Sequence, residues 1–282
     1  MTYEHPHKDP NLSGPNRAMK YDADGEPVLR VSVENVESNS GTAIGSNKPF
    51  YLEVSQGLID GYSSNHKFGA VPEMSQNTTG SIWDVDDTLY PWDALGAGSV
   101  VNVERNNVAD EGETITVQGL DANYDFVEED ITISGADTVG STTFIRVNRA
   151  FVKTNGGTNV GDIDIEVGAA GGTTIARITA GLGQTLMAVY TIPAGKTAYL
   201  LSMCASAEND TDATITMLSK AVGGVFRVVS TFELQQRGGG FNHEFIVPLA
   251  ILEKTDIDVR AITRASNKRI TSTFDVLLVD NA

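Results

Sequence analysis

The sequence has little that would fix a fold covalently or place it in a membrane. Its 282 residues include a single cysteine, Cys204, so no disulfide can form within one chain. No apolar run approaches the ~20 residues that a membrane-spanning helix needs. The first residues, Met1–Lys8, lack the hydrophobic segment of a secretory signal. We therefore expect a chain that is made in a cytoplasm and is held together by packing, by assembly, or by both.

Positive charge is also scarce. The chain has 20 Lys and Arg against 37 Asp and Glu, which gives a formal net charge of −17. A nucleic-acid backbone requires clustered cations that release its counterions, and an anionic membrane surface attracts basic segments. The charge balance therefore predicts no nucleic-acid partner and no membrane partner. It also predicts that copies of the chain repel one another except where close packing overcomes the repulsion.

Helical periodicity is nearly absent, and short alternating segments separated by Gly- and Pro-containing turns predict an all-β fold. The pattern is clearest in residues 181–282, where strands spaced about ten residues apart indicate a jelly-roll-like antiparallel β-sandwich. The strands expected there are Thr185–Ile192, Thr197–Ala205, Ala213–Ser219, Val225–Leu234, Phe241–Val247, Asp256–Ile262 and Ile270–Val279.

Alternation within these strands predicts which side chains are buried. In Ile257–Ile262 one face is apolar and the other carries Asp258 and Arg260, so we expect a packed face and a solvated face. Cys204 follows an apolar run, and we expect it to be a small buried side chain.

The rest of the chain divides into three parts. Residues 1–45 are polar and broken by prolines, which predicts an extended N-terminal arm, ordered by a partner, with a first strand at Leu29–Val36. Residues 46–97 are rich in Gly, Ser, Asn and Pro, which predicts an irregular docking segment after a second strand at Pro49–Val54. Residues 98–180 are expected to form a small β domain.

The small β domain is expected to contain six strands, and one of them carries an acidic ladder. In Asp162–Val167 three acids share one strand face, which is typical of a solvated face. The expected strands are Val100–Val103, Thr114–Val117, Glu128–Ser134, Thr142–Val152, Ile163–Val167 and Thr174–Thr179.

One short motif carries recognisable chemistry. The run Asp84-Val85-Asp86-Asp87-Thr88 resembles the first motif of the haloacid-dehalogenase-like phosphatases. The resemblance implies Asp84 as nucleophile, Asp86 as general acid and base, and Mg²⁺ held by both. That motif belongs at the tip of a buried parallel strand, whereas polar loop residues precede it here and no helix follows. The phosphatase is therefore a remote alternative, and a Ca²⁺ held by Asp84, Asp86 and Asp87 is another; otherwise we expect no metal and no cofactor.

Large aromatic side chains surround the motif. Trp83, Tyr90 and Trp92, together with Phe68, lie in the segment expected to be irregular, and such aromatics are typical of interface contacts. No nucleophile elbow, no cluster of Cys and His, and no phosphate-binding Gly-rich loop appears in the sequence. The pattern favours a protein that presents a surface over an enzyme.

Several segments resemble virion structural proteins of tailed bacteriophages, especially those of marine and cyanobacterial hosts. The resemblance covers residues 60–282 and is carried by Lys67–Gly69, Ile82–Asp84, Gly119–Asp125, Tyr190–Tyr199, Gly223–Phe226 and Phe274–Asn281. It implies a non-enzymatic capsid decoration (cement) or head–neck protein made in the bacterial host cytoplasm. Its expected partners are copies of itself, as a trimer or higher oligomer, and major capsid or neck and tail proteins. The alternative is a tail-fibre or adhesin module that binds host glycans.

Overall fold

The computed structural model describes residues 20–21, 27–28, 49–208, 211–235 and 240–281. The chain separates into two units, Met1–Lys48 and Pro49–Ala282. In the first unit, strands β1 (Lys20–Tyr21) and β2 (Pro27–Val28) form an antiparallel pair. The strand predicted at Leu29–Val36 lies outside the described residues.

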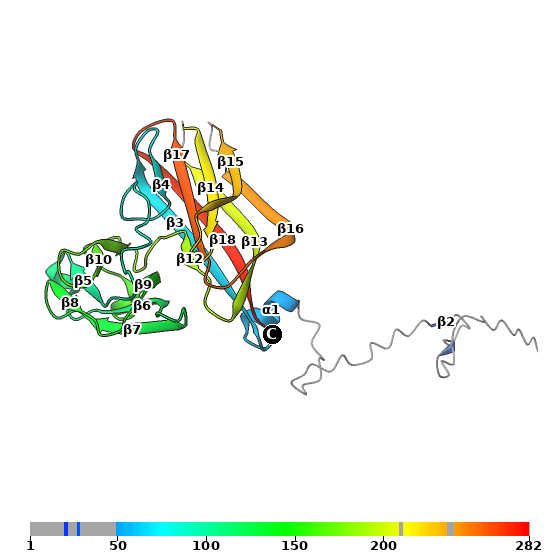
Figure 1. The fold of residues 1–282 in the computed structure, drawn as a ribbon, viewed down its shortest axis with the longest axis horizontal. Coiled ribbons are helices and arrows are strands. Elements are labelled where there is room, and N and C mark those ends of the chain that lie inside the picture. Colours follow the sequence, from blue (N-terminus) through cyan, green and yellow to red (C-terminus); the bar gives the residue numbers. More distant parts are fainter. Residues whose placement is uncertain (1–19, 22–26, 29–48, 209–210, 236–239, 282) are drawn as a thin grey trace, which may run out of the picture. The chain divides into compact units, whose positions relative to one another are not determined.

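The unit Pro49–Ala282 is built almost entirely from β-strands, and the predicted all-β class is confirmed (Figure 1). Two facing sheets form its larger sandwich. One has the order β16-β13-β18-β3, and the other has the order β12-β17-β14-β15 with β4 paired to β17. The strands are β3 (Tyr62–Met74), β4 (Thr79–Ser81), β12 (Val189–Thr191), β13 (Lys196–Ala207), β14 (Ala213–Lys220), β15 (Arg227–Leu234), β16 (Gly240–Ile251), β17 (Asp256–Thr263) and β18 (Lys268–Asp280).

The strand order is that of a jelly roll. Among the last six strands, β13, β16 and β18 lie in the first sheet, and β14, β15 and β17 lie in the second, where β14 and β15 are a hairpin. The strand that completes the first sheet, β3, comes from far earlier in the chain. In the second sheet β4 and β12 pair with different ends of β17, through Arg260–Ile262 and Asp256–Asp258 respectively, so they occupy one strand position between them. Two four-position sheets with this connectivity are the jelly-roll architecture.

The segment predicted to be irregular contains part of the sandwich. β3 spans thirteen residues and pairs along its length with β18, so most of residues 62–81 are strand and not docking loop. The predicted strand at Pro49–Val54 is wrong, because Phe50–Ser55 forms the short helix α1. The backbone N–H of Leu52 and that of Glu53 both donate to Pro49 O, and Gly57 (φ 67°) follows the last turn.

The small β domain is an insertion into the jelly roll. The chain leaves the second sheet after β4 and returns at β12, and Ala188 N donates to Ile82 O (2.9 Å) where the two connections meet. A Cβ on Gly69 of β3 would lie 2.3 Å from both Ala188 N and Ile82 O. Glycine is therefore required at position 69, because the backbone of β3 passes directly over the crossing.

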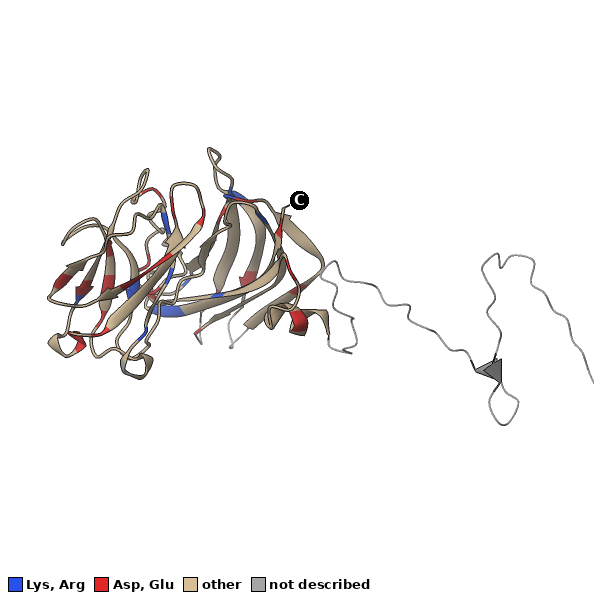
Figure 2. Cartoon of the chain, turned by 90° about the horizontal axis from the view of Figure 1, so that it is seen from below, with Lys and Arg blue, Asp and Glu red and all other residues tan. Residues whose placement is uncertain are grey.

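The inserted module, defined here as strands β5–β11, contains two small sheets. Their orders are β11-β10-β5-β8 and β7-β6-β9. The strands are β5 (Val101–Arg105), β6 (Thr114–Leu120), β7 (Phe126–Thr132), β8 (Asp137–Val139), β9 (Arg146–Val152), β10 (Ile163–Val167) and β11 (Thr174–Ile178), with short 3-10 turns at Val108–Asp110 and Asn155–Gly157. Asp and Glu are distributed along the strands and loops of the chain, and Lys and Arg are fewer (Figure 2).

Each module has its own hydrophobic core. The jelly-roll core contains the alternate residues of the facing strands, such as Leu200, Met203 and Phe274. Because Met203 points inward, its neighbour Cys204 on β13 is exposed, so the prediction of a buried cysteine is wrong. None of the helices in the described ranges is long and apolar enough to cross a membrane.

Candidate functional site

The acidic motif does not form a metal centre. The Asp86 carboxylate is exposed and accepts from the N–H and hydroxyl of Thr88 (2.8 and 2.6 Å), while Asp87 accepts from Ser75 N (3.0 Å). Asp84 is buried and accepts from Thr179 Oγ1 (3.3 Å) and Leu186 N (3.2 Å). Across the described residues no group of three or more His, Cys, Asp or Glu side chains is placed to hold a metal ion.

Asp84 occupies an unfavourable place for a charged group. Its Oδ1 atom is buried without a hydrogen-bond partner, and burial raises the pKa of the carboxyl to about 7 despite the hydrogen bond from Leu186 N. The motif also lies between β4 and the inserted module, not at the tip of a parallel strand followed by a helix. The surroundings that a phosphatase nucleophile needs are therefore not present in this fold.

The aromatic residues of the motif region pack inside the chain. Trp83, Tyr90 and Trp92 are 2%, 5% and 7% exposed, and their rings contact one another edge to face. Tyr90 Oη donates to Val147 O (3.2 Å) in β9, and Trp92 Nε1 donates to Asp258 Oδ2 (3.1 Å) in β17. The prediction that these three side chains contact a partner is corrected: they join the inserted module to the jelly roll. Phe68 alone of the predicted set is partly exposed.

One buried ion pair crosses this junction, and two more lie beside it within the jelly roll. The guanidinium of Arg146 in β9 binds the Asp256 carboxylate in β17 through two hydrogen bonds, and Lys220 Nζ lies 3.3 Å from the same carboxylate. Asp258 accepts from Arg260 Nε (2.8 Å). The face of β17 predicted to meet water is therefore buried, with Asp256 2% and Asp258 0% exposed, because the inserted module covers it.

The acidic ladder of β10 is likewise buried in part. Asp164 is 6% exposed and pairs with the guanidinium of Arg177 at 2.6 and 2.9 Å. Glu166 accepts from Asn102 Nδ2 (3.1 Å) and Gly171 N (3.0 Å). The solvated-face prediction is wrong for these two residues, since neighbouring strands supply donors that the local sequence does not show.

One Ser, Asp and His set comes together on the first sheet without the order that catalysis needs. Ser202 Oγ donates to Asp275 Oδ2 (2.6 Å), and His66 Nδ1 lies 2.5 Å from Asp275 Oδ1. The carboxylate stands between the hydroxyl and the imidazole, whereas a nucleophilic serine requires the imidazole in the middle. The set is a structural hydrogen-bond chain.

A more distinctive surface lies at the edge strand β16. Leu200 and Ser202 of β13 pair with Leu249 and Glu244, so the four residues Phe245–Pro248 bulge out opposite a single residue. Ile246 is 99% and Val247 77% exposed at this bulge. Singly exposed apolar side chains are common on protein surfaces, but adjacent ones that form a continuous patch mark interaction sites.

A groove adjoins the bulge on the outer face of the same sheet. We call it the outer groove; its volume is about 510 Å³, and it is lined by Tyr51 and Val54 of α1, Leu201, Leu277, Ile246 and Pro248 among others. Leu277 lies between the core residues Val276 and Leu278, so its side chain faces away from the jelly-roll core. The bulge and the groove together form one largely apolar surface.

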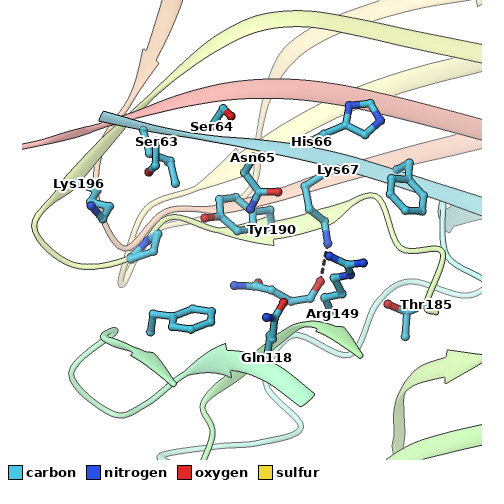
Figure 3. A pocket seen from close by; sticks show the side chains of 15 residues that line it. Ser63, Ser64, Asn65, His66, Lys67, Gln118, Arg149, Thr185, Tyr190 and Lys196 are labelled. Carbon is cyan, nitrogen blue, oxygen red and sulfur yellow. Dashed lines mark hydrogen bonds between the residues drawn. The ribbon is translucent and has the colours of Figure 1, made fainter. Parts of the chain in front are cut away.

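A second cavity, the Lys67 pocket, lies where β3 passes the inserted module (Figure 3). It has a volume of about 290 Å³ and includes Lys67 of β3, Gln118 of β6, Arg149 of β9 and Tyr190 of β12. Lys67 is 6% exposed and its ammonium donates to Asn148 O. No sequence motif predicts this pocket, because Lys67 and Arg149 come from strands that only the tertiary fold brings together.

No protein-family model and no curated protein matches the sequence. Among solved structures, one titled as the structure of infectious bursal disease virus, Gx strain, aligns at 11% identity over 78% of this chain and 72% of that chain, with a TM-score of 0.22. The VP2 subviral particle of infectious bursal disease virus aligns at 9% identity over 79% of this chain and 77% of that chain, with a TM-score of 0.21. Both similarities are weak.

Proposed function

We propose that this chain is a non-enzymatic virion structural protein that assembles with copies of itself through the surface formed by α1, the outer groove and the β16 bulge. The observation that carries the proposal is the bulge, where Ile246 and Val247 project from an edge strand with exposed fractions of 99% and 77%. A lone apolar protrusion is costly in water, and a partner surface that buries it removes that cost.

A second copy is the occupant that the geometry favours. The protruding side chains of Ile246 and Val247 and the outer groove lie side by side on one surface. Each copy can therefore insert its bulge into the groove of another copy. Surfaces of this kind are self-complementary and generate symmetric oligomers. Among the described residues that line the groove, Glu244 and Asp275 alone carry carboxylates. This low local charge matters because copies that each carry a net charge of −17 repel one another elsewhere.

The finer assignment is a bacteriophage capsid decoration or head–neck protein, as a trimer or higher oligomer, with major capsid or neck proteins as further partners. It is supported by the segments of this sequence that resemble tailed-phage virion proteins and by the jelly roll, an architecture found in viral capsid and lectin domains. The second of these is a fold-level analogy. On this proposal the protein is made in the bacterial host cytoplasm and works in the virion.

A glycan-binding adhesin is the second candidate, favoured by the Lys67 pocket with its aromatic and amide lining. The adhesin cannot be tested with the C-terminal region, residues 181–282, expressed alone. That region lacks β3 and β4, so its jelly roll would be incomplete. Binding to host cells is to be measured with the full chain. Loss of cell binding in a pocket variant that still joins particles would favour the adhesin.

Sedimentation velocity of the full chain tests the assembly surface. We expect the wild type to associate in the micromolar range and Val247→Asp to weaken association about 10-fold or more, since a buried carboxylate without a partner is costly. Val108→Asp is the matched control, because Val108 is 70% exposed and lies in the short 3-10 turn Val108–Asp110 of the inserted module, not in the jelly roll that carries the bulge. A wild type that remains monomeric, or equal effects of the two substitutions, would contradict the proposal.

A further inference from the structure

The described residues that line the Lys67 pocket include three cationic side chains, Lys67, Arg149 and Lys196, and no carboxylate. Lys196 pairs with Asp280, which does not line the pocket, whereas Lys67 and Arg149 lie close together. Lys67 extends from β3 toward Arg149 on β9 (Figure 3), and no Asp or Glu in the described part of the chain lines the cavity. In a chain with 37 acidic residues and 20 Lys and Arg this is an unusual local balance. Most other lysines in the described ranges with a recorded partner lie against a carboxylate, as Lys153 does with Asp130 and Lys196 with Asp280.

The charged form of Lys67 is unfavourable in the place where it lies. It is buried, it uses one of its three donors on Asn148 O, and no ion pair among the described residues includes it. Burial, and after it the charge of Arg149, lowers the pKa of Lys67 to about 7. An apolar side chain at this position would avoid both the desolvation and the repulsion. A group that is destabilising where it stands points to a role in binding.

The rest of the lining indicates the kind of ligand. Asn65 and Gln118 offer amide groups, and Thr185 offers a hydroxyl. Tyr190, Phe68 and Phe126 add aromatic surface. Most of the lining residues are polar or charged, and the aromatic rings supply a smaller apolar part, which suits a polar ligand more than an apolar one. A volume of about 290 Å³ accommodates a ligand the size of one sugar ring.

We propose that the Lys67 pocket binds the carboxylate of a small hydroxylated ligand, of the size of a sugar acid, between the Lys67 ammonium and the Arg149 guanidinium. The guanidinium is well suited to a planar carboxylate, because its parallel N–H groups match the two oxygens. The amides and Thr185 then contact the ligand hydroxyls. Without a ligand, the Lys67 ammonium and the Arg149 guanidinium repel each other. An anion bound between them offsets this repulsion.

Calorimetric titration of the full-length protein at pH about 6, where Lys67 is mainly charged, tests this assignment. The probes are sodium glucuronate, glucose as the uncharged analogue, and inorganic phosphate as the tetrahedral anion, all at matched ionic strength. We expect glucuronate to bind and glucose not to bind measurably. A ligand that lacks the carboxylate leaves the buried Lys67 ammonium without a counter-ion, which costs about 10-fold or more in affinity.

Two variants and a control decide whether the pocket is responsible. Lys67→Met removes the ammonium, and Arg149→Gln removes the guanidinium at an exposed position where folding is not at risk. Each is expected to weaken glucuronate binding about 10-fold or more, whereas Lys153→Met, on an exposed lysine, leaves it unchanged. No glucuronate binding by the wild type, unchanged binding by Arg149→Gln, or tighter binding of phosphate than of glucuronate would each overturn the proposal.

Discussion

The guanidinium of Arg146 in β9 donates two hydrogen bonds to the carboxylate of Asp256 in β17, from Nε (2.9 Å) and Nη2 (3.0 Å). The two residues are 110 positions apart and belong to different modules. Thr191 Oγ1 donates to the same carboxylate (2.7 Å), so the pair is satisfied on both sides. This contact fixes the inserted module to the sheet from which it departs.

Breaking that pair is expected to destabilise the protein strongly. Arg146→Leu leaves the buried Asp256 with Lys220 as its remaining cation, and removal of one partner of a buried pair costs ~3 to 5 kcal/mol. Urea unfolding followed by tryptophan fluorescence measures the loss, because Trp92 lies beside Arg146. Lys153→Gln, which breaks an exposed pair with Asp130, is the control and is expected to cost less than ~1 kcal/mol. Equal losses in the two variants would show that the junction pair adds nothing.

Any side chain at position 69 is expected to destabilise the protein, because Gly69 packs directly on the backbone of Ile82 and Ala188. Gly69→Ala places a methyl group against the backbone of Ile82 and Ala188, and relief requires the strands to shift, at a cost of ~1 to 3 kcal/mol or more. Gly135→Ala is the matched control, since its Cβ would lie 3.6 Å from the nearest recorded atom, Asp137 O. We expect that control to change the free energy of unfolding by no more than ~0.5 kcal/mol. A Gly69→Ala protein as stable as Gly135→Ala would show that the close approach is absent.

Substitution of Asp84 by Asn is expected to stabilise the protein at neutral pH but not at pH 4. The folded state holds the pKa of Asp84 at about 7, against 3.8 for the free group. The folded protein therefore retains a proton that the unfolded chain has lost, and stability falls as pH rises from about 4 to about 7. Asp84→Asn removes this loss, so its free energy of unfolding should match the wild type near pH 4 and exceed it by ~2 to 4 kcal/mol above pH 7.

Asp86→Asn is the control for this titration, because the Asp86 carboxylate is exposed. We expect its difference from the wild type to stay within ~0.5 kcal/mol across the same range. Denaturant unfolding at a series of pH values gives both curves. A constant difference between Asp84→Asn and the wild type would contradict the assigned pKa.

Burial of Lys67 has the opposite effect on the pH dependence of stability, at pH values above 7. Its folded pKa of about 7 lies below the free value of 10.5, so the unfolded chain binds the extra proton between these values and stability rises with pH across that window. Lys67→Met should be more stable than the wild type by ~1 to 3 kcal/mol below pH 7, and the gain should shrink toward pH 10. The charged and titratable groups around Lys67 are Arg149, His66, Tyr190 and Lys196, and the variant retains them all, so the difference isolates Lys67.

Much of the fold could be predicted from local patterns. The strand Ile163–Val167 has its predicted bounds, and every strand expected after residue 181 overlaps one in the structure. β3 was missed because Ser63–Lys67 is a polar run. Its partners Leu277 and Val276 on β18 lie more than 200 residues away, and they supply the apolar contacts that the local sequence lacks.

The candidate site was harder to predict for the same reason. Trp83 and Trp92 stand in irregular chain, and sequence alone does not distinguish a side chain that packs on a partner from one that packs on an inserted module of the same chain. Asp164 and Asp258 carry charges that suggest solvent, yet Arg177 and Arg260 make their burial tolerable. The Lys67 pocket depends on a juxtaposition of β3 and β9 that no spacing along the chain encodes.

The most direct test of the proposed virion role is cryo-electron microscopy of the virus particle whose genome encodes this chain. We expect jelly-roll density at many symmetry-related positions, with Ile246 and Val247 of one copy seated in the outer groove of its neighbour. Density spread over the capsid would indicate decoration, and density at the neck would indicate a connector. Absence of the chain from the particle, or bulges that face solvent in every copy, would contradict the proposal.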